Sequence, residues 1–269
     1  MRSPQTQRFN LVDLLFYCLI AFGWSWLCWL GSTLVLPSAG IASAILGILG
    51  SFGPSVAAIV LAARRSDVRS FLIRAYDWRI RWIWYAIAFF FPAVLMSIAL
   101  GLYELFSGTL PHSPASGRGW LVVVNFILVL LMGGPLGEEL GWRGYLLPRL
   151  QARFNALWSS LILGLIWSSW HLPLFLIPGT VQQQLPIVPF YLNTIALSFL
   201  FSWLWAHTRG SVVLAIVFHT GVNGWSWVIP ILPNVAHSLR PYYIGTILLW
   251  VTAVLVMSFS HPQKASRSV

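Results

Sequence analysis

The feature that most constrains this chain is a succession of apolar runs, each about 20 residues long, that recur along nearly its whole length. A run of this length crosses the hydrocarbon core of a bilayer as an α-helix. Only 8% of the 269 residues are charged, against about 25% in an ordinary soluble domain. The sequence therefore predicts an all-α polytopic membrane protein. Because no segment remains for a separate soluble domain, residues 1–269 are expected to form one integral membrane domain.

The hydrophobic pattern predicts a bundle of about eight transmembrane helices. They are expected at residues 11–36, 41–63, 82–106, 120–142, 156–177, 189–206, 211–230 and 243–260. The basic stretch Met1 to Arg8 precedes an apolar run that is longer than the core of a signal peptide, so the first of these helices is expected to be retained.

The distribution of lysine and arginine predicts the orientation of the bundle. With eight helices, fourteen of the sixteen basic residues fall on the side of the N-terminus, and only Arg118 and Arg240 fall on the other. Cytoplasmic loops carry such an excess, so both termini are predicted to be cytoplasmic. The net charge of +10 is interpreted as a topology signal, and no nucleic-acid partner is expected. The expected location is the plasma membrane of a prokaryote.

A pair of carboxylates, Glu138 and Glu139, ends a run of eighteen uncharged residues that begins at Trp120. Ionisable groups inside a membrane cost several kcal/mol, which indicates a function for the pair. Residues four apart share one face of a helix, so Glu139 is expected to pair with Arg143 and to leave Glu138 free. Pro135 predicts a bend or a helix start just before them.

Three further polar residues stand out in the apolar runs. Pro173 predicts that the helix carrying His171 ends there. His219 and Asn223 are four residues apart and share a helical face. Four other polar residues receive no functional assignment, because each lies near a predicted helix end or can bond a neighbouring helix: Asp13, Glu104, Asn125 and Asn193.

These residue types suit a hydrolase that has no serine or cysteine nucleophile. A carboxylate and an imidazole together can take a proton from water. A second imidazole and an amide can donate hydrogen bonds to a developing oxyanion.

The order of the motifs resembles that of a known family. Glu138-Glu139-x-x-x-Arg143 is followed by Trp167-x-x-x-His171 and then by His219-x-x-x-Asn223, on successive predicted helices. This pattern, over residues 120–227, is similar to the CPBP family of CAAX prenyl endopeptidases and bacteriocin-processing or Abi-type intramembrane proteases. One departure is Trp167, where the family often has phenylalanine.

The resemblance implies a role for each motif residue and a protein or peptide substrate. Glu138, helped by His171, would activate water as the general base, and Glu139 and Arg143 would orient the site. His219 and Asn223 would stabilise the oxyanion. Metal use stays open, because zinc or another divalent metal could bind Glu138, His171 and His219, while no HExxH motif is present.

Two other functions are compatible with the same residues. Glu138 and His219 could relay protons in a proton-coupled transporter. A non-catalytic membrane scaffold or immunity protein could retain the fold alone. The sequence indicates neither the substrate, nor whether a prenyl group is needed, nor the oligomeric state.

Overall fold

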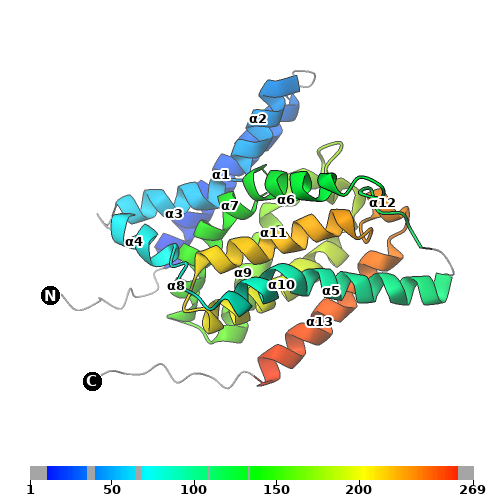
Figure 1. The fold of residues 1–269 in the computed structure, drawn as a ribbon. Coiled ribbons are helices and arrows are strands. Elements are labelled where there is room, and N and C mark those ends of the chain that lie inside the picture. The colour runs from blue at the N-terminus through cyan, green and yellow to red at the C-terminus, as the bar shows by residue number, and fades with distance from the viewer. Residues whose placement is uncertain (1–10, 35–39, 65–67, 108–109, 133, 260–269) are drawn as a thin grey trace.

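A computed structural model of the chain describes residues 11–34, 40–64, 68–107, 110–132 and 134–259. Helices and turns make up this part of the chain, with no strand in the described ranges, so the predicted all-α class is confirmed (Figure 1). The N-terminal basic stretch, the C-terminal tail and most of the first predicted loop lie outside the described residues.

The helices follow one another along the chain with short connections. They are α1 (Leu11–Leu34), α2 (Gly40–Gly50), α3 (Gly53–Ala63), α4 (Val68–Ala75), α5 (Trp82–Ser107), α6 (Trp120–Met132), α7 (Pro135–Glu139), the π-helix η1 (Leu140–Leu146), α8 (Leu147–Gln151), α9 (Ala156–Trp170), the 3-10 helices η2 (Leu172–Phe175) and η3 (Gln182–Gln184), α10 (Ile187–His207), α11 (Val212–Val228), α12 (Pro233–Ala236) and α13 (Arg240–Phe259).

Among the described residues, six helical segments are long and apolar enough to cross a membrane. The number rises to seven if α2 and α3, which meet at an angle of 53°, are one broken span. The chain is an integral membrane protein, but the predicted count of about eight is approximate. When α2 and α3 are counted together, the span predicted at 156–177 is the one that falls short, because α9 ends at Trp170 and is too short to be counted.

The long helices pack around α10 and α11. α11 lies against α5 and α6, and α10 lies against α9 and α13. At the other end of the molecule α1 packs against both α2 and α3, and α3 in turn packs against η1. In Figure 1, α1 and α2 project beyond the remaining helices, while α7 lies between α3 and α11. The segment that carries Glu138 is therefore enclosed by other helices.

Gly141 allows the close approach of η1 to α3. A Cβ at this position would overlap the backbone of Pro54. We therefore expect Gly141→Ala to lower the free energy of unfolding by about 1–3 kcal/mol, the usual cost of overpacking. Gly101→Ala is the matched control, since a Cβ at this helical glycine of α5 meets nothing within 4 Å. Thermal unfolding in detergent should separate the two variants, and equal melting temperatures would contradict the prediction.

Candidate active site

The helix that carries Glu138 starts where the sequence predicts a break. Gly134 precedes it with a φ of 103°, a conformation that glycine adopts readily, and Pro135 occupies the first turn. The backbone N–H of Glu138 donates to the carbonyl of Gly134 over 2.8 Å. A Cβ on Gly134 would collide with Oε1 of Glu138, so the glycine also leaves room for the carboxylate. Gly133, the other residue of the predicted bend, lies outside the described part.

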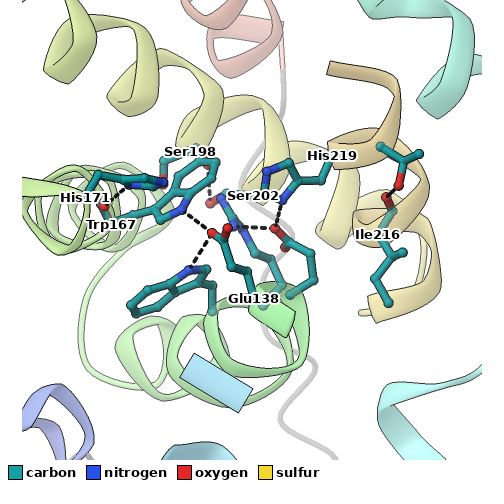
Figure 2. A network of polar contacts seen from close by, with 11 residues as sticks. Glu138, Trp167, His171, Ser198, Ser202, Ile216 and His219 are labelled. Carbon is teal, nitrogen blue, oxygen red and sulfur yellow. Dashed lines mark hydrogen bonds and ion pairs between the residues drawn. The ribbon is translucent and has the colours of Figure 1, made fainter. Parts of the chain in front are cut away.

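Glu138 is 4% exposed, and its carboxylate is held at one oxygen (Figure 2). Oε2 accepts a hydrogen bond of 2.7 Å from Nε1 of Trp167 and one of 3.2 Å from Nε1 of Trp142. Oε1 accepts none from the residues that the structure describes. The expectation that Glu138 is left free of partners was therefore wrong. The two indole donors were missed, since Trp167 had been noticed only as an aromatic residue.

Glu139 forms the predicted ion pair with Arg143. Nη1 of Arg143 lies 2.9 Å from Oε1 of Glu139, and both side chains are fully buried. The same oxygen of Glu139 accepts from Nδ1 of His219 at 2.7 Å. The guanidinium carbon of Arg143 lies 4.3 Å from the ring centre of Trp167 and 3.7 Å from that of Phe201. These ring faces stabilise the buried cation.

Both histidines are oriented through Nδ1. His171 follows the last residue of α9, and its Nδ1 lies 2.8 Å from the carbonyl oxygen of Trp167. A carbonyl only accepts, so Nδ1 of His171 carries the proton and Nε2 keeps a lone pair. Nδ1 of His219 likewise donates to the carboxylate of Glu139. In both rings Nε2 remains for other partners.

One cavity of about 580 Å³ lies inside the bundle. Its wall includes the four side chains predicted to carry the chemistry, which are Glu138, His171, His219 and Asn223. Figure 2 shows Trp167, His171 and His219 gathered around Glu138. Glu139 and Arg143 are fully buried behind this wall. The structure therefore brings together residues from α7, the end of α9 and α11, which are far apart in the sequence.

Two residues given no functional assignment also line the cavity. Asn125 donates from Nδ2 to the carbonyl of Gly224 at 3.0 Å, and Asn193 donates from Nδ2 to Oγ1 of Thr246 at 3.0 Å. Both bond a neighbouring helix, as expected. The sequence did not predict that they line the cavity, because a single asparagine in an apolar run has no second polar residue at helical spacing to indicate a shared face.

The side chains of the candidate metal set do not converge as ligands. In the described ranges, no group of three or more His, Cys, Asp or Glu side chains has an arrangement that could hold a metal ion. Glu138, His171 and His219 therefore do not fit a three-ligand site in this arrangement, and no step through a metal is derived.

The fold and the cavity define a class: a helical integral membrane protein with an acid, two imidazoles and an amide around one internal space. Comparison with known proteins agrees with this class. Residues 119–225 match the family model described as type II CAAX prenyl endopeptidase Rce1-like. The resemblance predicted from the three motifs is confirmed over this segment.

A curated relative is similar over a longer stretch. The CAAX prenyl protease 2 of Methanococcus maripaludis is 33% identical over 141 residues, which cover 49% of this chain and 51% of the relative. The chain thus matches about half the length of that protein.

Proposed function

We propose that this protein is an intramembrane endopeptidase, and that it works in the plasma membrane of a prokaryote. The observation that carries the proposal is that Glu138, His171, His219 and Asn223 line one cavity. The family match over residues 119–225 supports it. We further propose that residues 1–269 form a single membrane domain whose catalytic core is 120–227.

The first step is the attack of water on a peptide carbonyl. Glu138 takes a proton from the water through Oε1, the oxygen that receives no hydrogen bond from the described residues. Nε2 of His171 accepts the other hydrogen of this water and orients it, since its lone pair is fixed by the Nδ1 contact to Trp167. The hydroxide oxygen bonds to the carbonyl carbon, and the carbonyl electrons move to its oxygen.

The resulting oxyanion is stabilised by His219 and Asn223. Nδ2 of Asn223 donates one hydrogen bond, and His219 donates a second from Nε2 in its imidazolium form. The carboxylate of Glu139, 2.7 Å from Nδ1, stabilises that imidazolium. When the carbon–nitrogen bond breaks, Glu138 returns its proton to the amine. The products are a new carboxyl end and a new amino end.

The cavity favours an apolar peptide segment as the substrate. Apolar side chains from several helices form much of its wall, including Leu95 of α5, Val129 of α6 and Leu197 of α10. Apolar walls with a few polar groups are typical of sites that bind apolar ligands. The relative is named a CAAX prenyl protease, so a CAAX peptide is the first substrate to test.

The proposal is tested with purified protein in liposomes. A CAAX peptide is supplied with and without a prenyl group on its cysteine, together with an unrelated apolar peptide, and new C-termini are identified by mass spectrometry. Cleavage supports the endopeptidase, and the three peptides show whether the prenyl group is required. Proton-coupled flux without cleavage would favour a transporter. Absence of both activities would leave the scaffold.

Loss of the amide donor should slow the reaction without changing substrate binding. We expect Asn223→Ala to lower kcat by about 100-fold, because one oxyanion donor contributes about 100- to 1,000-fold. KM should change little, since the oxyanion exists only after attack. Steady-state kinetics on the preferred peptide provide the measurement. A raised KM with an unchanged kcat would instead assign Asn223 to substrate binding.

A further inference from the structure

Trp167 contacts four of the six residues predicted to form the site. It is 3% exposed and lies in the last turn of α9, one turn before His171. Its contacts use the indole N–H, the ring face, a T-shaped ring pair and the backbone carbonyl. They reach Glu138, Arg143, His219 and His171, respectively.

The indole N–H fixes the carboxylate of Glu138. It donates over 2.7 Å to Oε2, whereas the second indole, that of Trp142, donates over 3.2 Å. Because both indoles donate to Oε2, this oxygen is fixed in place and Oε1 is left to take the proton from water. Phenylalanine, which has no N–H, could not make this contact.

The ring of Trp167 also contacts Arg143 and His219. Its face lies 4.3 Å from the guanidinium carbon of Arg143, which pairs with Glu139. The ring forms a T-shaped pair with the ring of His219, with centroids 5.5 Å apart and planes at 81°. Figure 2 shows Trp167 next to Glu138, with His171 on one side and His219 on the other.

We propose that Trp167 is a positioning residue for the reaction, which fixes Glu138 through its indole N–H so that Oε1 faces the cavity. This inference rests on the proposed function. The backbone carbonyl and most of the ring persist in Trp167→Phe, so this variant removes chiefly the N–H.

The kinetic test compares two tryptophan substitutions. Trp167→Phe should lower kcat about tenfold, the factor that corresponds to about 1.4 kcal/mol, and should leave KM within about twofold. Trp225→Phe is the matched control. Its indole also donates one hydrogen bond, 2.9 Å long, to the carbonyl of Phe89, but it does not line the cavity. Wild-type kcat in Trp167→Phe, or an equal loss in both variants, would overturn the inference.

A second measurement does not depend on cleavage or on the stability of the phenylalanine variant. In a nuclear magnetic resonance spectrum of ¹⁵N-tryptophan-labelled protein, Glu138→Ala, which removes the acceptor, should shift the indole N–H resonances of Trp167 and Trp142 and leave that of Trp225 in place. An unshifted Trp167 resonance would overturn the inference. If the wild type cleaves nothing, the proposed function fails, while the spectrum still decides whether the indole holds Glu138.

Discussion

Glu138→Gln is expected to lower the rate of peptide cleavage by about 1,000- to 10,000-fold, to near the background of the assay. Glutamine has the shape of glutamate, and its side-chain oxygen can still accept from Trp142 and Trp167. It cannot take a proton from water, so only the base is removed. The measurement is kcat on the peptide that the wild type cleaves best, together with the melting temperature of both proteins.

Glu104→Gln is the matched control for this substitution. Glu104 is an exposed acid near the end of α5 and is not part of the cavity wall. Its replacement changes the net charge in the same way and should leave kcat unchanged. If Glu138→Gln retained more than about a tenth of the wild-type rate, Glu138 would not be the general base.

Local spacing predicted the parts of the site that lie on one helix. Residues four apart share a face, so the pair Glu139 and Arg143 followed from the sequence, and its 2.9 Å ion pair is confirmed. Pro135 predicted the restart of the helix at α7 in the same way, because it has no N–H to donate. In both cases the relevant geometry is set within about one helical turn.

Contacts between helices could not be derived in this way. The bond from Trp167 to Glu138 joins residues 29 apart in the sequence, and that from His219 to Glu139 joins residues 80 apart. Each depends on how two helices are rotated about their axes, which the apolar pattern of a membrane protein defines poorly because lipid-facing and buried side chains are both apolar. The span predicted at 156–177 was too long because the apolar run continues past Trp170, although Pro173 had correctly predicted the break beside His171.

The site consists of residues that line the cavity and of a fully buried ion pair behind them. Glu138, His171 and Asn223 line the cavity, where they can contact a substrate. Arg143 and Glu139 lie behind it at zero exposure, where the surrounding protein excludes water. Nε and Nη2 of Arg143 have no hydrogen-bond partner among the described residues, so the aromatic faces and Glu139 supply most of its stabilisation. This ion pair should therefore govern stability as well as activity.

Arg143→Met is expected to lower the free energy of unfolding by about 3–5 kcal/mol, because it leaves the carboxylate of Glu139 buried without its cation. Adding Glu139→Gln should recover most of this loss, since methionine and glutamine bury no net charge in the same volume. Cleavage should not recover, because His219 then has no carboxylate to stabilise its imidazolium. Unfolding in detergent and the peptide assay measure the two effects separately.

Stability and cleavage rate, measured for the wild type, Arg143→Met and the double variant, show whether the ion pair acts through stability alone. If the ion pair acts only through stability, the double variant should regain activity together with its melting temperature. If Glu139 also supports the charge on His219, across the 2.7 Å contact, stability and activity should separate. A double variant no more stable than Arg143→Met would contradict the premise that the unpaired carboxylate causes the loss. Glu139 then could not be the residue that both determines the stability of the buried ion pair and supports the charge on His219.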